Sequence, residues 1–289
     1  NRQVNHVTLR STVNTWGCDE NAHMNVQFYF AKFDDADRVF RARFTLPSLS
    51  RKARLTRHVR YHREAAAAAM IEIRSAIVRR NGKPVAVRHL MTSEPDHLIL
   101  ATALDTYQPD ALAQISADLQ APSVDWGEIS DALPRGLHIT PSREDDEASL
   151  RQRIATYHGV LHPRDFAADG HLLDRAFISC FTDAAPHTWW EGGIEPAWLQ
   201  QNNFGRVAVE MKLTYGAMPQ PGAVVSMETA FLAVGNTTFT LRHTLTSAGQ
   251  IIAYGDLVSL MMDLDRRKAV PLPERADRMR QLAAAGSWR

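Results

Sequence analysis

The chain has 289 residues, of which 45% are hydrophobic, and its 33 basic and 32 acidic side chains leave a net charge of +1. The length favours two domains and the composition a packed globular protein, while the charge balance gives no basic surface for nucleic acid or an acidic membrane. Two cysteines, Cys18 and Cys180, indicate no disulfide framework and no cysteine zinc site. No apolar run approaches the roughly 18 residues of a membrane helix, so the expected compartment is the cytoplasm.

Hydrophobic spacing predicts the elements in chain order. Apolar residues from Val26 to Phe40 recur at helical spacing, which predicts an amphipathic helix over residues 25–43. The period then changes towards two, and segments 70–78 and 85–91 flank Asn81-Gly82, a strong hairpin signal. The pattern fades over 108–152, which predicts an irregular linker with one short helix. A helix over 172–190, strands over 224–234, 238–245 and 251–262, and a surface helix in the tail follow.

The second half of the chain repeats the first at two constant offsets. Over the helix the offset is 148 positions, as from 23 to 171: His23/His171, Tyr29/Phe177 and Phe33/Phe181. Over the sheet it is 154 positions, as from 61 to 215: Tyr61/Tyr215, Ala76/Ala230 and His89/His243. The change indicates six extra residues (154 minus 148) between helix and sheet in the second copy. We therefore expect an α+β protein with domains at 1–107 and 153–289, each a long helix wrapped by an antiparallel sheet, and a linker at 108–152.

Chemically competent side chains gather directly before the first helix, at Asp19, Asn21, His23 and Asn25. A helix N-terminus presents free backbone N–H groups and a positive dipole end, which can stabilise an oxyanion. A carboxylate just upstream could activate water or attack a carbonyl itself. The alternative interpretation is that Asp19 or Asn25 only caps the helix.

Residues 16–29, from Trp16-Gly17-Cys18-Asp19 to Phe28-Tyr29, resemble the opening motif of hot-dog thioesterases of the 4-hydroxybenzoyl-CoA thioesterase type. That motif is an acidic residue, a short turn, His-Met/Val-Asn and an aromatic residue on the helix. The spacing Asp19-x-Asn21-x-His23 is also similar to that of plant-type acyl-ACP thioesterases, which are tandem hot dogs. Residues 165–172 look like a weaker form, so the resemblance covers roughly 5–107 and 153–265.

The resemblance implies two fused hot-dog domains that form a pseudo-dimer within one chain, with possible further homo-oligomers. It implies an acyl-CoA (or acyl-ACP) thioesterase that needs no cofactor or metal. Asp19 would be general base or nucleophile, His23 would orient it or the water, Asn21 and Asn25 would complete the site, and N–H groups near His23 and Met24 would hold the oxyanion. Ala167 occupies the second-copy position of Asp19, so a degenerate site is expected there, with Asp165, Asp169 and His171 as its candidate residues.

Two other functions stay open: an acyl-thioester hydratase or dehydratase, for which the usual Asn-Pro-x-x-His-like run is missing, and a non-catalytic acyl-binding module. No nucleophile elbow, phosphate loop or dinucleotide fingerprint occurs. The remaining candidates are expected to be structural. They are the core histidines His89 and His243, the i, i+4 pairs His58/His62 and His158/His162, and buried Cys18. Glu64 is expected to be a surface charge, with a position facing the substrate as the alternative. The basic cluster over 51–60 is expected to be solvated, with contacts to coenzyme A phosphates as the alternative.

Overall fold

The structure is a computed structural model that describes residues 7–116 and 119–284. The chain forms two compact units. Unit 1 contains Asn1–Arg135 together with Leu173–Arg175, and unit 2 contains Gly136–Leu172 and Ala176–Arg289. Among the described residues, no helix is long and apolar enough to cross a membrane.

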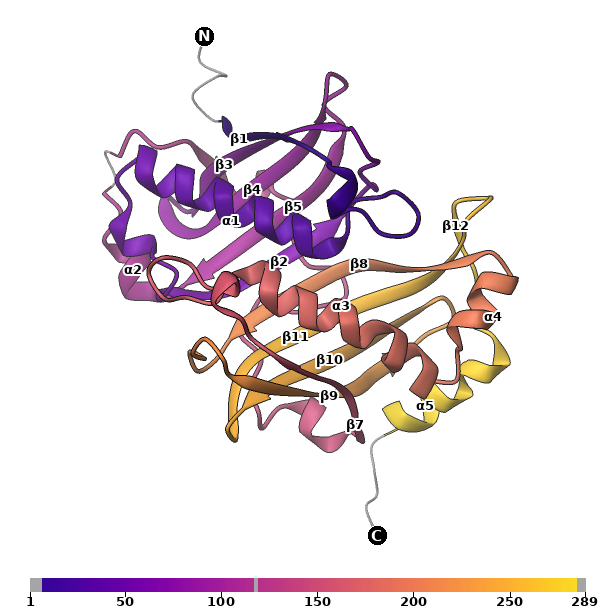
Figure 1. Cartoon of the computed structure of the whole chain (residues 1–289). Helices are drawn as coiled ribbons and strands as arrows, with labels where there is room; N and C mark the ends of the chain where they lie inside the picture. Colours follow the sequence, from indigo (N-terminus) through magenta and orange to yellow (C-terminus); the bar gives the residue numbers. More distant parts are fainter. Residues whose placement is uncertain (1–6, 117–118, 285–289) are drawn as a thin grey trace. The chain divides into compact units, whose positions relative to one another are not determined.

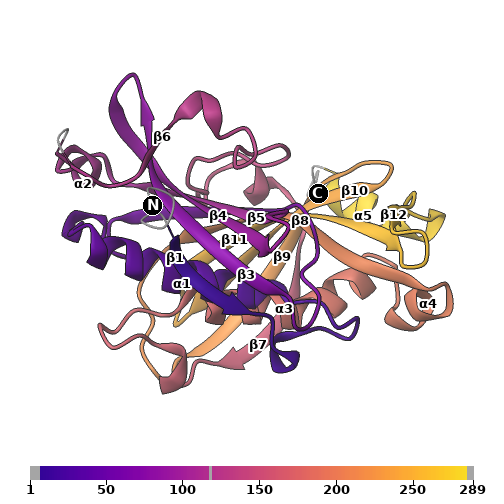
Figure 2. The same ribbon diagram turned by 90° about the horizontal axis from the view of Figure 1, so that it is seen from above.

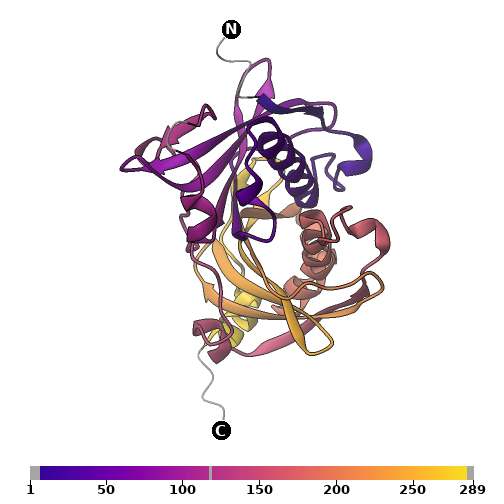
Figure 3. The same cartoon turned by 90° about the vertical axis from the view of Figure 1, so that its left-hand side faces the viewer.

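Unit 1 is one long helix packed on an antiparallel sheet. Its elements are β1 (Val7–Thr12), η2 (Thr15–Gly17), α1 (Val26–Arg43), η3 (Pro47–Leu49), β2 (Arg54–Tyr61), β3 (Met70–Arg80), β4 (Lys83–Glu94), β5 (Ile99–Tyr107), α2 (Pro109–Ala113), β6 (Ser123–Asp125) and η4 (Trp126–Glu128). The strand order is β1-β3-β4-β5-β2, and β6 runs parallel to β3 (Figure 1). In Figure 3, α1 is seen almost end-on.

Local chemistry explains the main elements of this unit. The side chain of Asn25 accepts a hydrogen bond from the N–H of Gln27 and so caps α1. The helix then buries Phe30, Phe33 and Phe40. Asn81 and Gly82 both have positive φ (52° and 75°), as a two-residue hairpin loop with the twist of its strands requires. The predicted helix and hairpin are confirmed.

Unit 2 repeats this plan. Its elements are η5 (Glu147–Leu150), β7 (Arg153–Val160), η6 (Pro163–Asp165), α3 (Asp174–Glu191, whose first two residues belong to unit 1), α4 (Pro196–Gln201), β8 (Phe204–Tyr215), β9 (Val224–Val234), β10 (Thr238–Ser247), β11 (Gln250–Asp263), β12 (Lys268–Ala269), η7 (Glu274–Ala276) and α5 (Asp277–Ala283). The strand order is β8-β11-β10-β9-β7, with β12 paired to β11.

The offsets found in the sequence reappear as structural equivalence. Helices α1 and α3 both have 18 residues and begin 148 positions apart (26 and 174). Strands β3 and β9 both have 11 residues and begin 154 positions apart (70 and 224). The connection that holds α4 has 12 residues (192–203), against 10 (44–53) for the connection that holds η3 in unit 1. Strand β8 has 12 residues against 8 in β2, so two of the six extra residues lie in the connection and four in the strand. The α+β class and the tandem repeat are therefore confirmed.

Residues 126–149, here called the covering segment, are more ordered than the predicted linker. In unit 1, His89 lies against Phe33 of α1, so its neighbour Arg88 points to the opposite face of the sheet, where it binds Asp131. Figure 2 shows α1 and the region after β6 on these two opposite faces. The side chain of Ile129 is fully buried there. Asp131 of the segment is therefore a partner of a sheet residue. The short helix predicted in the linker is α2.

In unit 2 the covering segment also lies on the sheet. The N–H groups of Gly136 and Leu137 donate to Glu210 on β8 (2.8 and 3.2 Å). Lys212 donates to the carbonyl of Thr140 at 2.7 Å, and Arg242 on β10 binds Asp146. The tail also differs from the prediction, because α5 buries Met279 and Leu282 and packs on β9 instead of lying free on the surface. The prolines before this helix interrupt the hydrophobic pattern of the sequence, so its apolar face could not be predicted from periodicity.

Candidate active site

The loop before α1 is a closed turn held by its own backbone. Cys18 and Met24 form an isolated antiparallel bridge, and the N–H of Asp19 donates to the carbonyl of His23 at 2.8 Å. The N–H of Ala22 returns to the carbonyl of Asp19 at 3.1 Å, which places Ala22 at a φ of 58°. Alanine thus adopts the left-handed conformation that glycine usually supplies, and the turn is preserved.

Asp19 uses only one of its two carboxylate oxygens to hold this turn. Oδ1 accepts the backbone N–H groups of Asn21 (2.9 Å) and His23 (3.1 Å). No described residue contacts Oδ2, and the side chain is only partly buried. Asp19 therefore does not cap the helix, and one carboxylate oxygen remains available at a fixed position. Asn21 is exposed and contributes its backbone N–H to this arrangement.

The start of α1 offers one free backbone donor. Asn25 is the capping residue, so the interpretation of this residue as a helix cap is correct. The N–H groups predicted to hold an oxyanion are occupied, because that of His23 donates to Asp19 and that of Met24 donates to the carbonyl of Ala65 at 2.8 Å. The N–H of Val26, the first residue of the helix, has no acceptor among the described residues. The N–H of Val26 is therefore left to bind an acceptor at this helix start.

A second loop pairs with the first and brings a further carboxylate to it. The N–H of Ala67 donates to the carbonyl of Ala22 at 2.9 Å, and His23 and Ala66 form an isolated antiparallel bridge. This pairing places Glu64 Oε2 3.7 Å from His23 Nδ1, which is buried and has no hydrogen-bond partner among the described residues. Glu64 is exposed, as expected of a surface charge, and it is also the acidic neighbour of His23.

Two tyrosines, Tyr29 and Tyr61, lie on the core side of the two loops. Tyr29, one turn into α1, is buried, and its hydroxyl oxygen accepts the N–H of Ala65 at 3.1 Å. Burial raises the pKa of Tyr29 to about 12, with the negative charge of Asp19 adding to the effect, so the phenol stays protonated at neutral pH. The ring of Tyr61 packs edge-on against that of Tyr29 at 5.2 Å. The site therefore has an apolar inner wall next to its carboxylates.

A family model of the thioesterase-like superfamily matches residues 13–107 and 161–280, so both copies of the repeat are covered. The chain belongs to this superfamily. The predicted resemblance and the prediction of a thioester hydrolase are thereby confirmed, whereas the roles of single residues rest on geometry. No curated protein sequence matches the chain.

Solved structures similar to this thioesterase-like chain share the fold. A putative oleoyl thioesterase from Lactobacillus plantarum has a TM-score of 0.61 at 11% identity, covering 91% of this chain and 96% of that one. An acyl-ACP thioesterase from Bacteroides thetaiotaomicron has a TM-score of 0.56 at 11% identity, covering 87% and 96%. The 12:0-ACP thioesterase from Umbellularia californica has a TM-score of 0.53 at 11% identity, covering 87% and 92%. The chain thus has the fold of tandem hot-dog thioesterases.

The second copy of this superfamily domain keeps the turn but has different side chains. The N–H of Ala167 donates to the carbonyl of His171 at 2.8 Å, as Asp19 does to His23 in the first copy. Gly170 (φ 85°) stands at the place of Ala22. Residues without a carboxylate or hydroxyl occupy the positions of Asp19, Tyr29 and Glu64; they are Ala167, Phe177 and Met218.

The acidic candidates of the second copy lie elsewhere on the turn. Asp165 accepts the N–H of His162 at 2.8 Å, and Asp169, which is 56% exposed, lies 3.0 Å from Nδ1 of the buried His171. Neither aspartate stands at the position of Asp19. The geometry therefore favours a single site, in the first copy.

The other histidine candidates are structural. His89 and His243 are buried, and Nδ1 of each contacts a hydroxyl on the neighbouring strand: Ser75 at 2.7 Å and Thr229 at 2.6 Å. They are the hydrogen-bonded core residues that the pattern predicts. His58 is buried within β2 and His158 lies on β7, so neither i, i+4 pair lies on a helix.

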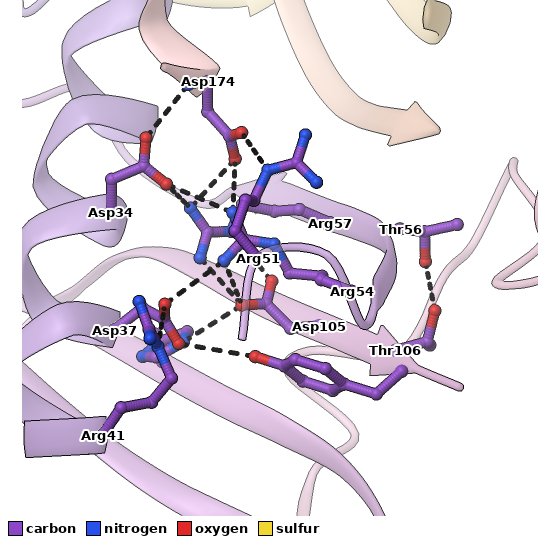
Figure 4. Close-up of polar contacts among 12 residues, drawn as sticks. Asp34, Asp37, Arg41, Arg51, Arg54, Thr56, Arg57, Asp105, Thr106 and Asp174 are labelled. Carbon is purple, nitrogen blue, oxygen red and sulfur yellow. Dashed lines mark hydrogen bonds and ion pairs between the residues drawn. The ribbon is translucent and has the colours of Figure 1, made fainter. Parts of the chain in front are cut away.

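Most of the basic cluster is not a solvated loop, although Lys52 is exposed. Arg54, Arg57 and Arg60 are buried on β2. Arg57 donates to Asp105 Oδ1 and Oδ2 (2.8 and 2.7 Å) and to Asp34 Oδ1 (2.7 Å). Figure 4 shows the complete ion-pair network that the cluster forms in unit 1: Asp34, Asp37, Asp105 and Asp174 with Arg41, Arg51, Arg54 and Arg57.

Charge balance explains how this network is tolerated beneath α1. Burial opposes ionisation of Asp105, but the charges of Arg57 and Arg54 outweigh it and hold the pKa of this carboxyl well below its usual range. Burial, followed by the charge of Asp174, raises the pKa of Asp34 to about 6. Asp37, His89 and Asp105 offer ligand atoms within 4.8 Å of one another, the spacing of a metal site, but arginines already neutralise these carboxylates.

Proposed function

We propose that this chain hydrolyses an acyl thioester, with acyl-CoA as the expected substrate and Asp19 as the reacting carboxylate. The observation that carries the proposal is that the two carboxylate oxygens of Asp19 differ in their hydrogen bonds. One oxygen is fixed by two backbone N–H groups, and the other has no partner among the described residues, seven residues before the first N–H of a long helix. A carboxylate oriented in this way is suited to general-base or nucleophilic chemistry at a carbonyl.

In the general-base route, Asp19 Oδ2 takes a proton from water while the water oxygen attacks the thioester carbon. The carbonyl oxygen becomes an oxyanion, for which the N–H of Val26 and the positive end of the α1 dipole supply stabilisation. The C–S bond then breaks, and the departing thiolate takes up the proton from Asp19. Water and thioester thus give free acid and thiol. In the nucleophilic route Asp19 Oδ2 attacks the thioester carbon and the C–S bond breaks, releasing the thiolate. Water then hydrolyses the mixed anhydride to the free acid and regenerates the Asp19 carboxylate, and the thiolate takes up the proton released.

His23 and Glu64 support this chemistry from the side of the second loop. The backbone N–H of His23 donates to Asp19, and Nδ1 of its imidazole lies 3.7 Å from the carboxylate of Glu64. A carboxylate beside an imidazole favours one tautomer and orientation of the ring. We therefore assign His23 the role of orienting the water or the thioester, with Glu64 as its acidic partner.

The test is thiol release from short, medium, long and aromatic acyl-CoAs and from acyl-ACP, comparing the wild type with Asp19→Asn. Asparagine keeps the oxygen that accepts the two N–H bonds, so the turn is retained while the base is removed. We expect kcat to fall by about 10²–10⁴. Mass spectrometry of the rapidly quenched reaction separates the two routes, because only the nucleophilic one adds an acyl group to the protein.

Each alternative function has its own outcome in this assay. A hydratase would change the enoyl absorbance without releasing thiol, and a binding module would do neither. Asp165→Asn is the matched control, because it removes an acidic candidate of the second copy. If Asp19→Asn kept full activity and Asp165→Asn lost it, the site would lie in the second copy and the assignment here would be wrong.

A further inference from the structure

Tyr29 connects the two loops of the candidate site from within the core. It is only 3% exposed, and its hydroxyl oxygen accepts the N–H of Ala65 at 3.1 Å. Ala65 is itself 1% exposed, so without this bond its N–H would be buried and unpaired. An unpaired buried donor is costly. The phenol therefore fixes the chain at Ala65, one residue after Glu64.

The hydroxyl has a consequence for Glu64 that ring packing cannot supply. The carbonyl of Ala65 accepts the N–H of Met24, and its N–H is held by Tyr29. Both backbone groups of Ala65 are thus occupied, which restricts the residue before it. Glu64 lies near His23, but its side chain is 32% exposed and the separation of 3.7 Å exceeds a hydrogen bond. The backbone held at Ala65 therefore contributes to the position of Glu64 opposite His23.

The second copy separates the role of the ring from the role of the hydroxyl. Phe177 stands at the position of Tyr29 and packs edge-on against Tyr215 at 6.1 Å, as Tyr29 does against Tyr61. The fold therefore accepts a phenyl ring without a hydroxyl. The copy that has Phe177 also has Met218 where the first copy has Glu64. The first copy therefore has both the hydroxyl and the carboxylate, and the second copy has neither.

We propose that Tyr29 is a positioning residue of the thioesterase site, whose hydroxyl holds the Ala65 backbone so that Glu64 faces His23. This inference rests on the proposed function and adds to it a residue that acts through Glu64. Tyr29 also keeps a hydroxyl hydrogen for which no described residue is the acceptor.

The test is a double-mutant cycle of Tyr29→Phe and Glu64→Gln, measured as kcat and KM for the best acyl thioester. We expect Tyr29→Phe to lower kcat about tenfold with KM within twofold, and to have less than a twofold effect in the Glu64→Gln background. Tyr107→Phe, which removes a buried hydroxyl 3.4 Å from Asp37 in the same unit, is the control and should leave kcat unchanged.

Amide hydrogen exchange supplies a readout that does not depend on activity. Exchange at Ala65 should accelerate at least tenfold in Tyr29→Phe and stay unchanged in Tyr107→Phe. Equal effects of Tyr29→Phe in both backgrounds, or full activity of this variant, would overturn the positioning role while leaving the thioesterase intact. A wild type that releases no thiol from any substrate would instead overturn the proposed function, and with it the role assigned to Tyr29.

Discussion

Arg57 is the residue whose loss should harm unit 1 most, and the second copy shows how that loss can be repaired. Its guanidinium is fully buried and binds Asp105, Asp34 and Asp174. Replacing it with methionine leaves three carboxylates short of a partner in a site without solvent. Removing one partner of a buried ion pair costs about 3–5 kcal/mol, which lowers Tm by roughly 10 °C for a unit of this size.

The compensating substitutions replace Arg57 and Asp105 with the residues found at the equivalent strand pair of unit 2. Arg57 lies opposite Asp105 between β2 and β5, and the equivalent pair between β8 and β11 is Met211 opposite Leu257. A well-packed apolar pair is often as stable as a buried ion pair. The double variant Arg57→Met/Asp105→Leu should therefore be more stable than Arg57→Met alone, with a coupling free energy of at least about 2 kcal/mol.

The assay is urea denaturation followed by circular dichroism, with the four proteins of the cycle compared at one pH. Arg38→Met, on the exposed face of α1, is the matched control and should change the free energy of unfolding by no more than about 0.5 kcal/mol. If Arg57→Met costs as little as this control, or if the double variant loses the sum of the two single losses, the network does not behave as a coupled buried group and the reasoning is wrong.

Two further predictions concern the turn and the covering segment. Ala22→Gly should raise the free energy of unfolding by about 0.5–1 kcal/mol in a thermal melt, because a left-handed backbone costs alanine roughly 1–2 kcal/mol and the flexibility of glycine in the unfolded chain offsets part of the gain; a destabilised variant would contradict this. The bond from Arg242 outweighs burial and lowers the pKa of Asp146, so its contribution should be present above about pH 4 and be lost as the pH falls further. Asp146→Asn should therefore be less stable than wild type at pH 7, and the gap should close in acid; a gap that persists at pH 2 would refute the assignment.

The fold could be predicted largely because the repeat states each pattern twice. The helical spacing of Phe30, Phe33 and Phe40 and the hairpin signal at Asn81-Gly82 are local, and local geometry alone determines both elements. The order of strands in each sheet was not predicted, because it depends on pairings between segments far apart in the sequence. The covering segment escaped prediction because its contacts, such as that of Asp131 with Arg88, join charged residues far apart in sequence.

Only part of the site could be predicted from the sequence, for a similar reason. Asp19 and His23 share one turn, so their proximity can be predicted from spacing. Glu64 is 41 residues beyond His23 (64 minus 23), and only the pairing of residues 22–24 with 65–67 brings it there. Arg57 looked like part of a surface cluster, because composition cannot show that three aspartates converge on it. A comparison with Met211, its partner in the repeat, was the available sequence signal.

The covering segment determines where this chain can be divided. A cut at residue 107 would remove Ser130, Asp131 and Leu133, which hold Arg60 and Arg88 in unit 1. A fragment that started at residue 153 would lack the backbone groups that bind Glu210 and Lys212 in unit 2. A division near residue 135 keeps these groups with their own units, but it still separates Asp174 from Arg54 and Arg57 of unit 1, so neither half of the sequence contains all the counterparts of its unit's buried charges.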